Sequence, residues 1–165
     1  MQFNKEIYIE DKLISSMSPT FIIAEAGVNH GGNMEIAKQL IDLAADAKAD
    51  AVKFQTFKTE HLILSDIQKA PYQKDTTDAS ESQYDMLKRL EVSREQNLDL
   101  KQYCMDKGIV FLTTPFDEES LEEIDDLDLP AYKVSSTDTT NLPFLKKIAK
   151  KGKPIFLSPG MSYLS

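Results

Sequence analysis

Three charged side chains lie inside or directly after apolar segments of this chain, where burial is costly unless the charges are used. Glu25 follows the run FII, Lys53 lies in AVKFQTF and Lys133 lies in AYKVSS. Two ammonium groups can bind a phosphate or a carboxylate, and a nearby carboxylate can accept a proton or hold a metal-bound water. The sequence therefore predicts a shared pocket for an anion, with a structural ion pair as the alternative for either lysine taken alone.

Uncharged polar side chains occur near the ends of the same segments. Because side chains alternate along an extended strand, Gln55 is expected on the same side as Lys53, and Ser135 on the same side as Lys133. The remaining hydroxyls at these ends belong to Thr113, Thr114, Ser136 and Ser158. Neither a P-loop nor a GxGxxG motif is present, so the pattern indicates a small phosphorylated acid and not a nucleotide.

Composition narrows the classes of partner. The chain has 165 residues and a formal net charge of −8, which argues against nucleic acid or a membrane surface as a partner, because both attract positive fields. No apolar run approaches the ~18 residues of a membrane span, and the N-terminal segment lacks the apolar core of a signal peptide. The single Cys104 can form no internal disulfide, so a cytoplasmic protein is expected.

Short apolar segments alternate with helical patterns along the chain. The strand-like segments are rich in β-branched and aromatic residues and cover 21–27, 51–57, 109–116, 131–136 and 154–160. The helical patterns cover 33–49, 93–108, 117–129 and 142–153. Strands that alternate with helices require a parallel sheet with helical crossovers, so the predicted fold class is α/β.

Two of the helices can be predicted in more detail. The second is expected to begin after the N-cap Ser93, to end before Gly108 and to bury Cys104 by packing. In the first helix, one apolar face is expected to consist of Ile36, Leu40, Leu43 and Ala44.

Two segments depart from the alternation. Residues 6–15, EIYIEDKLIS, alternate like a short β-hairpin that could cover the bottom of a barrel. Residues 58–82 are too long and too turn-rich for an ordinary connection between a strand and a helix. They are interpreted as a substrate-binding loop of a barrel enzyme, with a disordered excursion as the alternative.

Five strand–helix units cannot close a barrel. Either the sheet is open and doubly wound, or the chain is the first part of an eight-stranded (β/α)8 TIM barrel whose remainder would follow Ser165. The sequence stops just after a strand, with no helix to complete the fifth unit. A truncated barrel is therefore expected.

Five motifs in order, AEAGVNHGG, AVKFQTF, TTPFD, YKVSSTDTTNLP and GKPIFLSPGM, resemble those of the sialic acid synthase family. The family makes N-acetylneuraminate and relatives such as legionaminate, and the resemblance runs from Phe21 to Met161. It implies that residues 1–165 are the N-terminal part of a TIM-barrel synthase domain. The later barrel units and a small antifreeze-like domain, which covers the partner's site in a homodimer, would then be absent from this chain.

The resemblance also implies a reaction. The family condenses phosphoenolpyruvate with an N-acyl amino sugar such as N-acetylmannosamine and releases phosphate. By position, Lys53 and Lys133 match lysines that contact phosphoenolpyruvate, and Glu25 matches a glutamate needed for catalysis, which orients or deprotonates the attacking water or steadies a metal-bound water. A divalent metal, manganese or magnesium, is expected in the full-length protein, but its histidine ligands would lie on later strands, so no metal ligand is assigned here.

Further residues are matched as substrate-binding residues. Thr114, Ser136 and Ser158 match hydroxyl residues of the anion pocket, and Gln55 matches a residue near the amino sugar. Asp138 stands where many relatives have a glutamate that touches sugar hydroxyls, so the exact acceptor stays open. The chain has two histidines. His30 either bonds to the backbone of its turn or contacts the substrate, and both interpretations stay open. His61 is interpreted as a surface residue.

Two other functions are kept as alternatives. One is a 3-deoxy-ulosonate phosphate synthase, which would use the same reaction type with a phosphorylated sugar. The other is a non-catalytic half-barrel that self-associates through its exposed sheet edges. For the isolated chain, which would lack the metal and part of the sugar pocket, inactivity is expected.

Overall fold

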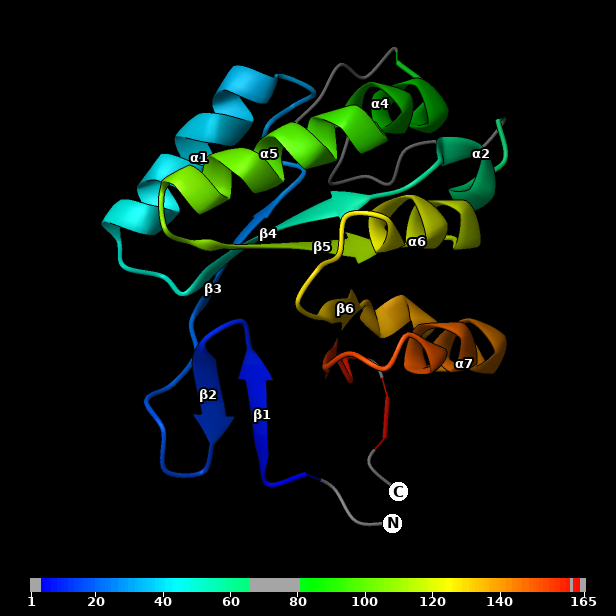
Figure 1. Cartoon of the computed structure of the whole chain (residues 1–165). Helices are drawn as coiled ribbons and strands as arrows, with labels where there is room; N and C mark the ends of the chain where they lie inside the picture. Colours follow the sequence, from blue (N-terminus) through cyan, green and yellow to red (C-terminus); the bar gives the residue numbers. More distant parts are fainter. Residues whose placement is uncertain (1–3, 66–80, 161, 164–165) are drawn as a thin grey trace.

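The computed structural model describes residues 4–65, 81–160 and 162–163. Parallel strands form one layer, and helices cover one side of it (Figure 1). One sheet joins β3 (Ile23–Gly27), β4 (Ala51–Thr56) and β5 (Val110–Pro115), and a second joins β6 (Tyr132–Val134) and β7 (Ile155–Leu157). All five predicted strands are therefore present in the predicted order, each one to four residues shorter than its apolar segment.

The described helices are α1 (Met34–Asp46), α2 (Thr59–Leu62), α4 (Gln83–Leu90), α5 (Arg94–Asp106), α6 (Glu118–Asp125) and α7 (Leu142–Lys150), with a 3-10 turn, η1 (Ser136–Asp138), before α7. Four of the helices, α1, α5, α6 and α7, lie within the predicted helical patterns. Ser93 caps α5 in a capping box with Gln96, and Gly108 follows it at a φ of 68°, as expected. None of the described helices is both long and apolar enough to span a membrane.

Two apolar clusters lie on opposite faces of the strands. The cluster between strands and helices contains Phe54, Phe111 and Tyr132, and the buried Cys104 packs there as predicted. The inner cluster lies at the other face and contains Ile9, Ala51, Val110, Leu112 and Ala131.

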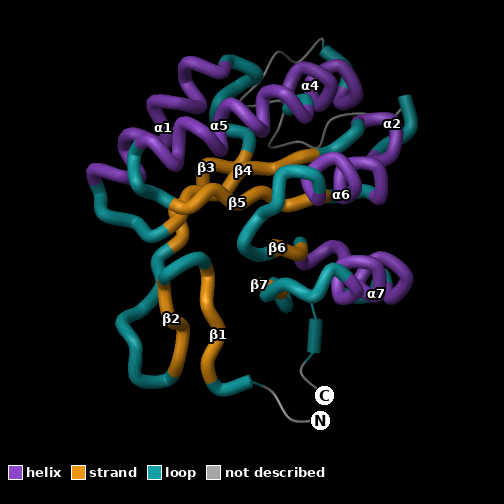
Figure 2. Tube along the Cα trace, in the orientation of Figure 1, coloured by secondary structure: helices purple, strands orange, loops and turns teal. Residues whose placement is uncertain are grey.

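The predicted hairpin closes the lower end of the inner face. It consists of β1 (Glu6–Ile9) and β2 (Lys12–Ser15), paired antiparallel. Ile9 is completely buried against Ala51 and Val110, which are the first residues of their strands. The expectation that the hairpin covers the bottom of the strands is confirmed (Figure 2).

The buried face of α1 differs from the prediction. Of the predicted face, Ala44 is buried and Leu40 packs partly buried against the core, whereas Leu43 is 65% exposed and Ile36 is also exposed; the other buried residues are Ala37 and Ile41. The prediction gave weight to side-chain size, but the two alanines let the helix backbone approach the strands, and this rotates the bulkier leucine onto the flank.

The long segment after β4 contains more structure than the sequence predicted. The short α2 lies within it, and α4 follows it with Ser82 as N-cap, accepting a hydrogen bond from the backbone N–H of Asp85 at 3.0 Å. Neither helix was predicted, because α2 is a single turn and α4 has only Met86 and Leu90 buried on its inner side. The loop prediction for residues 66–80 lies outside the described residues.

Candidate active site

Register brings the first two predicted catalytic residues together. Glu25 on β3 is paired with Lys53 on β4 in the parallel ladder. The Lys53 Nζ lies 2.8 Å from Oε1 and 2.7 Å from Oε2 of Glu25, and it also donates to Thr114 Oγ1 on β5 at 3.2 Å. Lys53 is only 6% exposed along its side chain, whereas Glu25 is 57% exposed because β3 is the edge strand of its sheet among the described residues.

A cavity of about 400 Å³ opens beside this ion pair. Lys133, from β6, and Ser158, just after β7, also line it, so four predicted site residues from four different segments border one space. The apolar part of the wall consists of Ile23, Ile155, Phe156 and Leu157. Two residues of this wall, Ile23 and Phe156, also pack against the inner apolar cluster, so the cavity lies on the same strand face as that cluster.

The local charge balance of the cavity is positive. Burial lowers the pKa of Lys133, the positive charge of Lys53 lowers it further, and the carboxylate of Glu25 partly opposes both effects. Two ammonium groups therefore face one carboxylate in a chain whose formal net charge is −8. Such a site favours a small anion over a cation.

A glycine with a left-handed backbone conformation leaves room for the carboxylate of Glu25. The ladder is irregular between Glu25 and Gly27, and Gly27 has a φ of 55°. A Cβ at Gly27 would lie 3.3 Å from Glu25 Oε1 and 3.6 Å from Gln55 Nε2. The side-chain amide of Gln55, a predicted site residue, therefore lies close to the carboxylate of Glu25. Gln55 is on the same side of β4 as Lys53 and is paired with Thr114 on β5.

Two predicted substrate-binding residues lie in the turn after β6. Ser136 packs against Gly160, where an added Cβ would lie 3.3 Å from the Ser136 Cβ. Asp138 is buried, and its Oδ1 accepts a hydrogen bond from the side chain of Asn141 at 3.3 Å, next to the start of α7. Neither residue lines the cavity with the lysines, and their predicted contacts to substrate stay predictions.

His30 lies away from this cavity. It is completely buried, its ring packs near Phe54 on the helix side of β4, and its Nδ1 accepts a hydrogen bond from the backbone N–H of Gly32 at 3.0 Å. Burial lowers the pKa of the imidazole. Of the two interpretations left open by the sequence, the structure has the bond to the turn backbone.

Thr113 turns to the helix side of its strand. Its hydroxyl lies 2.9 Å from that of Thr56, which accepts from Asn97 Nδ2 on α5 at 3.1 Å. All three side chains are buried. The two neighbouring threonines of β5 therefore differ, because Thr114 bonds to Lys53, whereas Thr113 bonds to Thr56, which in turn bonds to Asn97 on α5.

Residues 40–165 match the family model named NeuB. The chain belongs to the NeuB family. N,N'-diacetyllegionaminic acid synthase of Campylobacter jejuni is 49% identical to it over 148 residues, which cover 90% of this chain and 44% of that protein. N-acetylneuraminate-9-phosphate synthase of Homo sapiens is 36% identical over 148 residues, covering 90% of this chain and 41% of that protein. The predicted resemblance to sialic acid synthases is confirmed.

Solved structures agree with the NeuB assignment. N-acetylneuraminic acid synthetase from Leptospira borgpetersenii, solved in complex with citrate, matches with a TM-score of 0.83 and 33% identity, over 96% of this chain and 51% of that one. A DAHP synthase from Thermotoga maritima matches with a TM-score of 0.63 at 14% identity and supports the fold alone. The predicted α/β barrel class is confirmed, and the chain spans less than half the length of the two synthases compared by sequence.

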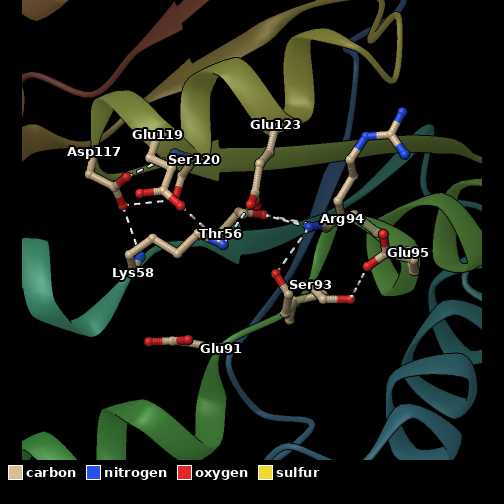
Figure 3. A network of polar contacts seen from close by, with 12 residues as sticks. Thr56, Lys58, Glu91, Ser93, Arg94, Glu95, Asp117, Glu119, Ser120 and Glu123 are labelled. Carbon is tan, nitrogen blue, oxygen red and sulfur yellow. Dashed lines mark hydrogen bonds and ion pairs between the residues drawn. The ribbon is translucent and has the colours of Figure 1, made fainter.

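A second ion-pair network of this NeuB chain was missed by sequence reasoning. Lys58, just after β4, pairs with Glu123 on α6 at 2.6 Å, and its backbone N–H donates to Asp117 at 2.9 Å (Figure 3). Asp117 also accepts from the backbone N–H and the hydroxyl of Ser120. A usable signal was present for Asp117 alone, because aspartate is a preferred N-cap residue and the predicted helical pattern begins there.

Hydrogen bonding fixes the charge of this second network. Burial alone would raise the pKa of Asp117, but the backbone hydrogen bonds from Ser120 and Lys58 outweigh it and lower the pKa. His61 lies half-exposed beside the same carboxylate, with its Nδ1 3.4 Å from Asp117 Oδ1. The network ties the segment after β4 to the start of α6.

The described part of the NeuB chain does not fit a metal site. No group of three histidine, cysteine, aspartate or glutamate side chains converges among the described residues. In the cavity, both oxygens of Glu25 face Lys53, which leaves a single and already neutralised carboxylate. No step is therefore derived through a metal for these residues.

Proposed function

We propose that the complete protein condenses phosphoenolpyruvate with an N-acyl amino sugar of the N-acetylmannosamine type, forming a sialic acid and phosphate. One observation carries the proposal: Lys53, Lys133 and Glu25 border one cavity whose local charge suits an anion. Membership of the NeuB family and the similarity to synthases named for legionaminic and neuraminic acids support it.

In this proposal the two lysines bind phosphoenolpyruvate. Lys53 and Lys133 contact the carboxylate and phosphate of phosphoenolpyruvate, and hydroxyls from Thr114, Ser136 and Ser158 complete the anion pocket. Carbon 3 of phosphoenolpyruvate then attacks the aldehyde carbon of the sugar, so a carbon–carbon bond forms, the π bond of the aldehyde breaks and its oxygen takes a proton from solvent. The positive charges stabilise the anionic groups through this step.

Glu25 acts on water in the second half of the reaction. Water adds at carbon 2, Glu25 orients it or takes its proton, and the tetrahedral intermediate expels phosphate by C–O cleavage. Gln55 and Asp138 contact the amino sugar. The proton that Glu25 accepts leaves with solvent after phosphate departs.

The setting of the enzyme is also a proposal. The complete protein would be a cytoplasmic homodimer with further barrel units and an antifreeze-like domain. A divalent manganese or magnesium ion would polarise the aldehyde when bound. The described residues form no site for it, so its ligands are assigned to a part of the protein outside them.

Phosphate release tests the proposal. The complete protein is incubated with manganese, phosphoenolpyruvate and N-acetylmannosamine, and released phosphate is measured for the wild type and for Lys53→Ala, Glu25→Ala and Glu118→Ala. Glu118 is the control for Glu25, because it is equally exposed and pairs with Lys147 on the outside of the fold. We expect activity in the wild type and Glu118→Ala only. Full activity in both site variants would contradict the assignment, and activity with arabinose 5-phosphate alone would contradict the acceptor.

A further inference from the structure

The hydrogen-bonding capacity of Lys53 is already used. A lysine ammonium has three N–H donors. Lys53 Nζ has three oxygen partners within hydrogen-bond distance: Oε1 of Glu25 at 2.8 Å, Oε2 of Glu25 at 2.7 Å and Thr114 Oγ1 at 3.2 Å. With 6% of its side chain exposed, Lys53 has no donor left for an incoming ligand while Glu25 stays in place.

The second lysine of the cavity is in a different state. Within the described part of the chain, the hydrogen bond of the Lys133 Nζ is to Val134 O, at 2.9 Å. Two donors of Lys133 therefore remain for a ligand in the cavity, which Lys133 lines together with Ser158. An anion can contact Lys133 at once, but it can contact Lys53 only after a partner of Lys53 has left.

Glu25 is the partner that can leave. It lines the cavity and its side chain is 57% exposed within the described residues, so its carboxylate can turn from Lys53 toward the solvent of the cavity, whereas Thr114 is buried. Gly27 has no side chain to block the carboxylate from one side. While it is formed, the ion pair neutralises the charge of Lys53.

We propose that Glu25 is the resident counterion of this cavity and that an anionic ligand binds by displacing its carboxylate from Lys53. Under the proposed function, on which the identity of the ligand rests, that ligand is phosphoenolpyruvate. The displaced carboxylate is then free to act on water only when the acid is bound. Glu25 thus competes with phosphoenolpyruvate for Lys53 before binding, and it acts on water after phosphoenolpyruvate has bound.

Anion affinity tests this exchange. Binding of phosphoenolpyruvate and of inorganic phosphate to the complete protein is measured by calorimetry for the wild type, Glu25→Gln and the matched control Glu118→Gln. An amide of the same shape cannot neutralise Lys53, so Glu25→Gln should bind both anions about threefold to tenfold more tightly. Glu118→Gln, whose carboxylate is 58% exposed but pairs with Lys147 away from the cavity, should bind them like the wild type.

Glu25→Asp protects the test against misfolding. A side chain one methylene shorter reaches Lys53 poorly, so the tightening should be smaller and in the same direction. The proposal is overturned if both Glu25 variants bind the anions no more tightly than the wild type, or if neither the wild type nor the variants bind them at all. Phosphate release by the wild type is measured in parallel: tighter phosphate binding in Glu25→Gln without any wild-type turnover would refute the proposed function and leave the counterion exchange standing.

Discussion

Lys53 lies within β4 and Lys58 follows the strand, five positions later, and each pairs with a carboxylate at close range. Lys53 lies on the inner face of β4 and faces a cavity, whereas Lys58 lies beyond the strand and pairs with α6. Both lysines are largely removed from water, with 6% and 19% of their side chains exposed. Burial and ion pairing therefore do not distinguish a candidate site residue from a structural one.

The balance of charge around each lysine does distinguish them. Burial alone would lower the pKa of Lys58, but the hydrogen bond to Glu123 and the charges of Glu123, Glu119 and Glu91 raise it overall. More than one carboxylate therefore surrounds Lys58, and the local negative charge disfavours the binding of a further anion. Around Lys53 the excess is positive, because Lys133 adds a second cation opposite the single Glu25. A buried lysine is therefore a candidate for an anion site when the cations around it outnumber the carboxylates.

Removing each charge should affect activity very differently at the two lysines. Methionine keeps the length of either side chain and removes the ammonium group. We expect Lys53→Met to lower kcat/KM for phosphoenolpyruvate about 100-fold or more, because it deletes a contact to the reacting acid. Lys58→Met should stay within about threefold of the wild type. Equal losses in both variants, at a temperature where circular dichroism shows both folded, would remove the distinction.

Stability should show the opposite order. Lys58→Met leaves Glu123 without its partner in a place where one of its oxygens is already buried and unpaired, so we expect a loss of about 2–3 kcal/mol in the free energy of unfolding. Lys53→Met should cost less than about 1 kcal/mol, because the exposed Glu25 returns to water. Urea unfolding measures both losses.

A double variant controls this stability prediction. Adding Glu123→Gln to Lys58→Met removes the unpaired charge and should recover about half of the loss. If the double variant is no more stable than Lys58→Met, the ion pair is not the cause.

A smaller effect concerns pH. The pKa of Lys133 is lowered, so its charge is lost at a lower pH than that of an ordinary lysine at 10.5. Affinity for phosphoenolpyruvate should therefore begin to fall while the pH is still below 10.5, by about threefold, since the neutral amine still donates hydrogen bonds. Lys133→Arg keeps its charge and should lose this dependence. The same pH profile in both proteins, measured by calorimetry, would contradict the role given to Lys133.

Much of the fold follows from local signals that the sequence carries. Alternation predicted that Lys53 and Gln55 share a side, and periodicity with capping residues predicted α5 from Ser93 to Gly108. The five strands and the hairpin were predicted for the same reason. These features depend on residues close together in the chain.

What the sequence could not predict depends on distant partners. The partners of Lys58 come from α6, about sixty residues later, and nothing near Lys58 distinguishes it from a solvated loop lysine. The rotation of α1, which exposes Leu43, depends on how closely Ala37 and Ala44 approach the strands. The exposure of Glu25 depends on its place in an edge strand, which only the sheet order reveals.

The two lysines of the cavity belong to separate backbone ladders. In the described residues, β3, β4 and β5 form one hydrogen-bonded sheet and β6 and β7 another, although β5 and β6 are neighbours. Lys53 is in the first ladder and Lys133 is in the second. A ligand that holds both ammonium groups would add a link between the two ladders, which the described structure joins through side-chain packing in a shared core. Saturation with phosphoenolpyruvate should therefore slow amide hydrogen exchange in β6 and β7, far beyond the few residues that the ligand touches.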